Sequence, residues 1–244
     1  MEALMMKHLA LIALVNFFLT TFPHSDLKGS STYMRPIPDS LTPLVSDEGR
    51  KILKEIVTIG CDKSFWRLIE QFSTQQEPTF CGLTTLAMTL NALKIDPQKN
   101  WKGIWRWYDE YMLLTTHELQ RVRERGLNLR ELSELATKNN LIVESVYSDK
   151  ISLEQFKKIL KRNLCSEDKF IIASYSRKVL GQTGDGHFSP IAAYHEKYKK
   201  VLILDVARFK YPPVWVDIHK FKQAMDINDS STQKSRGLIL VSKK

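Results

Sequence analysis

The chain has 244 residues, of which 43% are apolar and 26% charged, a composition typical of a globular protein with a hydrophobic core. It shows no internal repeat, low-complexity tract or long heptad pattern, which argues against solenoid, disordered and coiled-coil classes. The net charge of +9 favours anionic partners. The basic residues are nevertheless dispersed, mostly on polar helix faces, and no RNA-binding signature accompanies them, so we expect no nucleic-acid partner.

Residues 1–25 resemble a secretory signal peptide. Lys7 and His8 precede an apolar run at positions 9–22, which is too short for a comfortable membrane span and fits a secretory h-region. No small-residue cleavage motif follows, and a buried N-terminal helix is the alternative interpretation. The pattern favours export, to the periplasm or out of the cell, over a cytoplasmic location.

The rest of the chain is predicted to hold a linker at 26–46, marked by prolines, serines and threonines, and one domain at 47–244. Periodicity and capping residues predict helices at 47–57, 62–72, 81–92, 128–140 and 152–164. Strands are predicted at 141–148, 169–176, 187–196, 201–209 and 236–243, with a helix at 216–225 before the last strand. Helices first and strands afterwards indicate an α+β fold, with an N-terminal helical lobe and a C-terminal, mostly antiparallel sheet lobe. A helix-borne residue and strand residues would then face each other across a cleft.

The three cysteines are far apart and form no C-x-x-C pair, which argues against a zinc knuckle. A disulfide between Cys61 and Cys165 is compatible with an oxidising compartment, and the sequence leaves it open. Cys81 would then be the free thiol. It begins the helix predicted at 81–92, where the positive end of the helix dipole favours the thiolate, and Gly82 leaves room for an acyl carbon. A small buried hydrophobic residue is the alternative interpretation of Cys81.

A nucleophilic thiolate needs a base and a group that orients the base, and the strand region offers both. His187 follows a glycine-rich turn, and Asp205 interrupts an apolar run in which a carboxylate is costly unless it is paired. A hairpin centred near residue 196 would place the two opposite each other. Moving that centre by two residues would separate them by about 13 Å, so the pair requires one register or a bulge. His195 is the rival base, but it lies beside the turn and is expected to be solvated.

Gln75 lies six residues before Cys81. Its side-chain amide, together with the Cys81 backbone N–H, is suited to hold the oxyanion of a tetrahedral intermediate. Gln76 is the obvious rival, and spacing does not choose between them. Glutamine, cysteine, histidine and aspartate in this order are typical of a cysteine acyltransferase or peptidase.

Four stretches carry a specific resemblance: "EPTFCGLTTLAMTLNAL", "WKGIWRWYDEYML", "GQTGDGHFSPIAAY" and "LILDVARFKYPPVWV". They resemble phytochelatin synthase, and the resemblance covers about residues 47–244. It implies a papain-like fold in which Cys81 is the nucleophile, His187 the base, Asp205 its orienting carboxylate and Gln75 the oxyanion residue. Plant-type members carry a Cys-rich C-terminal extension and a Cys pair where this chain has Thr115 and Thr116. The chain therefore resembles the short prokaryotic members, which keep the catalytic domain alone.

The resemblance implies that a Cys81 thioester takes γ-glutamylcysteine from glutathione and releases glycine. The acyl group then passes to another glutathione or γ-Glu-Cys peptide, or to water, and hydrolysis can dominate in the short members. Two other functions stay open: a papain-like peptidase acting on ordinary peptides, and a non-catalytic binder of metal thiolates.

Arg208, Lys210 and Gly186 are the candidates for substrate contacts, although an ion pair between Arg208 and Asp205 is an equally good interpretation. No obligatory cofactor and no protein metal site are expected, because the remaining cysteines and histidines show no ligand spacing. Cadmium or zinc would enter as the glutathione bis-thiolate, as substrate or activator, in keeping with heavy-metal detoxification. The sequence leaves homodimerisation open.

Overall fold

The computed structural model describes residues 32–244, so the predicted leader at 1–25 and the first part of the linker lie outside the described residues. The compact unit runs from Tyr33 to Lys244. Within the described residues, no helix combines the length and the hydropathy needed to cross a bilayer.

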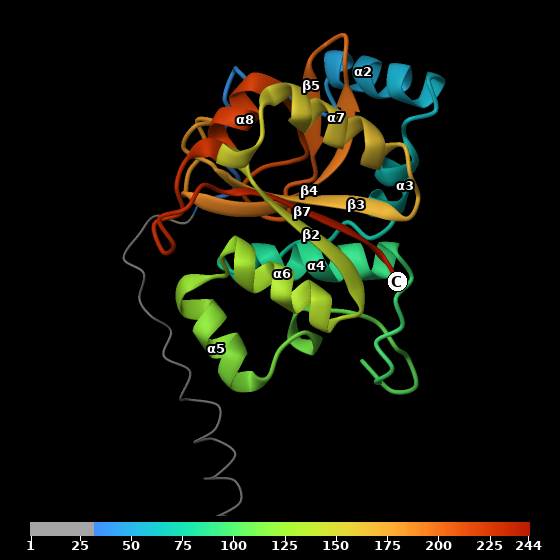
Figure 1. Ribbon diagram of the computed structural model, residues 1–244, viewed down its shortest axis with the longest axis vertical. Helices are drawn as coiled ribbons and strands as arrows, with labels where there is room; N and C mark the ends of the chain where they lie inside the picture. The colour runs from blue at the N-terminus through green and yellow to red at the C-terminus, as the bar shows by residue number, and fades with distance from the viewer. Residues whose placement is uncertain (1–31) are drawn as a thin grey trace, which may run out of the picture. The chain divides into compact units, whose positions relative to one another are not determined.

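A seven-stranded antiparallel sheet forms the centre of this unit (Figure 1). The spatial order of the strands is β1 (Thr42–Pro43), β6 (Val214–Asp217), β5 (Lys200–Ile203), β4 (Gly186–His195), β3 (Lys169–Ser176), β7 (Gly237–Lys243) and β2 (Leu141–Tyr147). Every neighbouring pair is antiparallel. The predicted α+β class is therefore confirmed.

Helices cover both faces of the sheet. They are α2 (Asp47–Thr58), α3 (Lys63–Ile69), α4 (Cys81–Ala92), α5 (Thr116–Arg125), α6 (Leu129–Lys138), α7 (Leu153–Leu164) and α8 (Ile218–Asp226), with short 3-10 turns η1 (Glu110–Met112) and η2 (Ser148–Lys150). Figure 1 shows α4 and α6 on one side of the sheet and α7 and α8 on the other. Consecutive residues of β3 accordingly join different apolar clusters: Ile172 packs on the α4 side, Ile171 and Ala173 on the α7–α8 side. Since both faces are buried, the strands read as continuous apolar runs.

Among the helices described, α4 has the largest share of buried residues. Ten of its twelve residues are buried, and only Cys81 and Asn91 are partly exposed. Gly82 allows the close packing at its first turn. A methyl group on Gly82 would lie 3.4 Å from side-chain atoms of Leu127 and Leu132 and 3.5 Å from Phe188. The glycine therefore fits the helix against its neighbours, which adds a packing role to the access role predicted for it.

Capping residues set several helix boundaries as predicted. Asn128 and Ser152 each accept a hydrogen bond from the third residue of their helix, whose side chain bonds back to the cap, which is a capping box. Thr115 forms a third capping box that begins α5, a helix absent from the sequence prediction. Each pair satisfies backbone N–H groups that the helix leaves without partners.

The linker prediction is wrong for residues 33–46, which belong to the folded unit. Thr42 and Pro43 pair with β6, and the backbone N–H of Leu44 donates to Pro213 O at 3.0 Å. The two-lobe separation is also incomplete. Strands β1 and β2 come from the first part of the chain, whereas α7 and α8 come from the second part and cover the opposite sheet face from α4.

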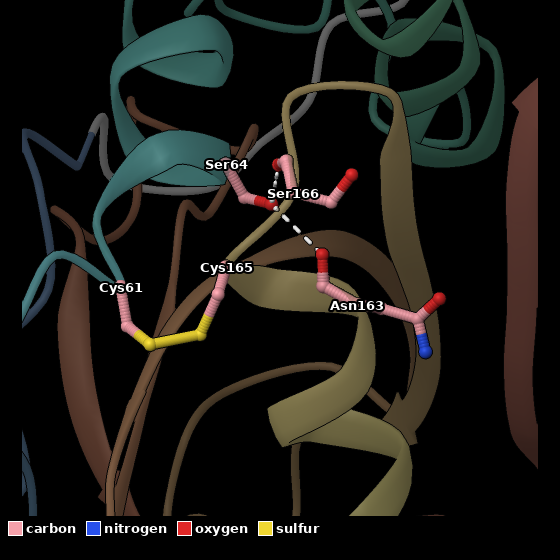
Figure 2. The surroundings of a disulfide bond; sticks show 5 residues. All are labelled: Cys61, Ser64, Asn163, Cys165 and Ser166. Atoms are coloured by element: carbon pink, nitrogen blue, oxygen red, sulfur yellow. Dashed lines mark hydrogen bonds between the residues drawn. A yellow bond between two sulfur atoms is a disulfide. The ribbon is translucent and has the colours of Figure 1, made fainter.

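A disulfide joins Cys61, just before α3, to Cys165, at the C-terminal end of α7 (Figure 2). It leaves Cys81 as the free thiol. Next to it, the Ser64 hydroxyl lies 3.1 Å from Ser166 O and 3.4 Å from Asn163 O. The helix that precedes the Cys81 segment is thereby tied to the far face of the sheet.

We expect the Cys61→Ala/Cys165→Ala double variant to be less stable than the wild type by about 2–5 kcal/mol, because a cross-link that closes a long loop restricts the unfolded chain. The two cysteines are 104 residues apart. Urea unfolding with and without reductant measures the difference. An unfolding midpoint that is the same in the variant, the reduced wild type and the oxidised wild type would contradict the prediction.

Candidate active site

The free thiol of Cys81 opens into a pocket of about 220 Å³ that His187 also lines. Cys81 is the first residue of α4, and Phe80 at the N-cap provides no side-chain acceptor for the first-turn N–H groups. The positive end of the helix is therefore directed at the sulfur. The predicted nucleophile and base thus meet at one pocket.

The ring of His187 is held by a buried carboxylate. Its Nε2 lies 2.9 Å from Asp205 Oδ1, and Asp205 is fully buried. The same oxygen accepts the backbone N–H of Ala207 at 2.8 Å. Because Nε2 faces Asp205, Nδ1 is the ring nitrogen that remains for Cys81.

A bulge in β4 brings Asp205 to this face of the sheet. Near the turn, Ala193 pairs with Leu202, but Ile191 pairs with Ile203, so Ala192 is an extra residue. If the pairing of Ala193 with Leu202 continued along the strands, residue 208 would lie opposite His187 and Asp205 would point to the other face of the sheet. The one-residue shift places residue 207 opposite His187 instead. Asp205 then lies on the same face, one diagonal step away.

Two details differ from the sequence prediction. Strand β5 ends at Ile203, so Asp205 follows the strand instead of lying within it. His195, the rival base, is 6% exposed and not solvated, since its Nε2 lies 3.2 Å from Glu55 Oε2 and its ring packs on Tyr198. The short hairpin folds it against α2.

Arg177 is a member of the site that sequence reasoning missed. It is 2% exposed, and its Nη2 donates to Asp205 Oδ1 at 2.7 Å and lies 2.8 Å from His187 Nε2. Its Nη1 donates to Gln182 Oε1 at 2.9 Å, and its guanidinium lies over the ring of Tyr211. The sequence prediction assigned no role to Arg177. The available signal was its position directly after an apolar strand and ten residues before His187.

The charges of the site shift its pKa values in directions that favour an ion pair. Burial alone would raise the pKa of Cys81, but the charge and hydrogen bond of His187, with a hydrogen bond from the Phe188 backbone, hold it below the ordinary value. Burial and Arg177 oppose protonation of His187, yet Asp205 and Cys81 outweigh them and raise the pKa of its imidazole. Asp205 is buried, but His187 and Arg177 hold the pKa of its carboxyl far below normal.

Gln75 lies close to this group through its backbone. Its N–H donates to Val206 O at 2.9 Å, one residue after Asp205. The side chain is 3% exposed; its Nε2 donates to Glu77 O at 2.8 Å, and its Oε1 is buried without a partner. Gln76 is exposed and lines a different cavity.

The predicted substrate-contact residues divide into two groups. Gly186 lines the Cys81 pocket, and a methyl group there would lie 2.7 Å from Arg236 Nη1. Arg208 is exposed over the ring of Phe72, and neither Arg208 nor Lys210 lines this pocket.

Arg236 and Arg125 supply the cationic groups of the pocket instead. Arg236 is 4% exposed; its Nη1 donates to Asp229 Oδ2 at 3.1 Å, its Nη2 lies 3.6 Å from Asp185 Oδ2, and its Nε is buried without a partner. Arg125 pairs with Glu131. The pocket therefore offers both signs of charge. Among residues 32–244, no three His, Cys, Asp or Glu side chains gather as a metal site.

Comparison with known proteins identifies the family of the chain. The phytochelatin synthase family model matches residues 32–238. Glutathione gamma-glutamylcysteinyltransferase 1 of Lotus japonicus is 43% identical over 212 residues, which are 86% of this chain and 42% of the relative. Glutathione gamma-glutamylcysteinyltransferase of Schizosaccharomyces pombe is 41% identical over 211 residues, which are 86% of this chain and 51% of the relative. The chain thus spans about half the length of these curated relatives, and it belongs to the phytochelatin synthase family.

Proposed function

We propose that the chain is a glutathione γ-glutamylcysteinyltransferase that works through a thioester on Cys81. The observation that carries the proposal is the shared pocket: Cys81 heads a buried helix, and His187, held by buried Asp205, lines the same space. The names of the relatives supply the substrate, glutathione. A helix-borne cysteine facing a histidine on an antiparallel sheet also supports a papain-like arrangement.

In the first half-reaction, the Cys81 thiolate attacks the carbonyl carbon of the Cys–Gly amide of glutathione. His187, protonated by the thiol, gives that proton to the glycine nitrogen as the C–N bond breaks, which leaves a γ-glutamylcysteinyl thioester. In the second, the amine of another glutathione or a longer peptide attacks the thioester carbon, His187 accepts its proton, and the C–S bond breaks to release the Cys81 thiolate. Water in place of the amine gives γ-glutamylcysteine.

Asp205 and Arg177 act on the base rather than on the substrate. Asp205 holds Nε2 and stabilises the imidazolium that forms when His187 takes a proton. Arg177 helps to keep the Asp205 carboxyl ionised. Because Arg177 also lies against Nε2, it limits how strongly His187 retains its proton.

The donor's γ-glutamyl end carries a carboxylate and an ammonium group, and the pocket carries a partner for each. The guanidinium of Arg236, a residue that lines the pocket, suits the carboxylate, and Asp229 or Asp185 suits the ammonium. Arg208 and Lys210, outside this pocket, stay candidates for the acceptor. Cadmium or zinc enters in this scheme as part of a glutathione bis-thiolate substrate.

The chemistry requires a single nucleophile. We expect Cys81→Ser to abolish glycine release from glutathione and the acyl-enzyme mass, because a serine hydroxyl stays protonated where the thiol is ionised. Amino-acid analysis of released glycine and mass spectrometry of the protein measure the two effects. Full glycine release by Cys81→Ser would overturn the proposal. Equal release from the isomer with an α-Glu–Cys bond would point to an ordinary peptidase.

The oxyanion role separates two neighbouring glutamines. We expect Gln75→Ala to lower kcat about 100- to 1000-fold, as the loss of one oxyanion donor does elsewhere. Gln76→Ala is the matched control, because its side chain is exposed, and it should change kcat less than twofold. A larger loss in Gln76→Ala than in Gln75→Ala would assign the role to the rival residue.

The thiolate should depend on His187. The pKa of Cys81 is lowered, so its alkylation by iodoacetamide should persist below pH 8.5 and fall only as the pH drops through the lowered pKa. In His187→Gln the burial of the thiol is unopposed by the imidazolium, so the midpoint should rise. At a pH well below both midpoints, a midpoint one pH unit higher leaves about tenfold less thiolate. The exposed His219→Gln serves as the control, and identical profiles for all three proteins would refute the ion pair.

A further inference from the structure

The Trp-rich stretch at 101–113 carries a buried carboxylate that the mechanism above does not use. Glu110, on η1, is 4% exposed and lines a second cavity of about 250 Å³, which is also lined by Gln76 and does not include Cys81. Its carboxylate accepts the backbone N–H of Gln76 at 3.1 and 3.3 Å. It also pairs with the hydroxyl of Thr84, one helical turn after Cys81.

These contacts tie together the parts that must meet in the reaction. On one side, the Gln75 N–H is held by Val206, next to Asp205. On the other, the Gln76 N–H donates to Glu110, which is also hydrogen-bonded to Thr84 in the first turn of α4. Two consecutive backbone groups are therefore fixed from two directions.

The segment that carries Glu110 is itself held by several hydrogen bonds. Asp109 accepts the indole N–H of Trp101 at 2.7 Å and caps Met112 N at 3.0 Å. Asn91, at the far end of α4, bonds to Tyr108 O at 2.9 Å and accepts Tyr108 N at 3.1 Å. The stretch is thus fastened to both ends of the helix whose first residue is Cys81.

We propose that Glu110 is a positioning residue: it sets the distance between the Gln75 amide and the Cys81 helix, and thereby the geometry of the oxyanion site. The inference rests on the proposed role of Gln75. The amide of Gln75 has two N–H donors, of which one is given to Glu77 O, and the other is free to point at an oxyanion. Its placement depends on the backbone that Glu110 holds.

Burial raises the pKa of Glu110, against the opposing hydrogen bonds from Thr84 and the Gln76 backbone. Burying a carboxyl group costs free energy unless hydrogen-bond partners offset that cost. Its partners here are the segment of the candidate oxyanion residue and the helix of the candidate nucleophile.

Two substitutions at Thr84 separate the effect of its hydrogen bond to Glu110 from the effect of its packing. Thr84→Val keeps the shape and loses the hydroxyl, whereas Thr84→Ser keeps the hydroxyl and loses a methyl group. The readout is the ratio of two rates at Cys81: acylation by p-nitrophenyl acetate, which forms an oxyanion, and alkylation by iodoacetamide, which forms none. Neither probe is glutathione, so the result does not depend on the natural substrate.

We expect the ratio to fall about tenfold in Thr84→Val and to stay within twofold of the wild type in Thr84→Ser, because small misplacements of a reacting group cost up to about 100-fold. Glu110→Gln, which keeps one acceptor oxygen, should also lower the ratio. In a Gln75→Ala background, Thr84→Val should have no further effect, since the two changes act through one group. An unchanged ratio in Thr84→Val, an equal fall in Thr84→Ser, or additive losses in the double variant would overturn the inference.

A different measurement, glycine release from glutathione, tests the proposed function. If wild-type protein released no glycine from glutathione, the transferase proposal would fail, while the acylation-to-alkylation ratio would still judge the role of Glu110.

Discussion

The buried carboxylate of Asp205 is the group on which the site depends. A fully buried charge is tolerated only where its neighbours replace water, and here one oxygen accepts from His187, Arg177 and the Ala207 backbone. Loss of this carboxylate would leave Arg177 as a buried cation without its anionic partner and would free the ring of His187. The same contacts therefore serve both folding and the orientation of the base.

The close packing of α4 fixes the position of the other groups of the site. Helix α4 is enclosed by neighbouring elements, and Gly82 lets its first turn approach them closely. Its first residue is therefore held in place, although it reaches the pocket. The Trp-rich stretch, whose aromatic residues suggest simple packing, fastens both ends of α4 and reaches the segment of Gln75 through Glu110. Polar contacts thus hold the segments that carry the candidate nucleophile, the candidate base and the candidate oxyanion donor.

Capping residues and long apolar runs in the sequence correctly predicted several helices and strands. The capping residues Asn128 and Ser152 begin the helices expected of them, and the long apolar strands lie where their composition indicates. The short strands β1 and β6 were missed because two- and four-residue strands beside prolines carry no period. His195 was expected to be solvated because its burial comes from α2, far away in the sequence.

The residue types and their order, by themselves, determined which chemistry the chain favours: a cysteine at a helix start, then a histidine and an aspartate in apolar surroundings. The tertiary structure decided whether those groups meet. A single extra residue, Ala192, shifts the register of β4 and β5 and turns Asp205 toward His187, and a bulge leaves no mark in a run of apolar residues. The tertiary structure also recruited Arg177 and Glu110, since a charged side chain reads as solvated until the elements that bury it are in place.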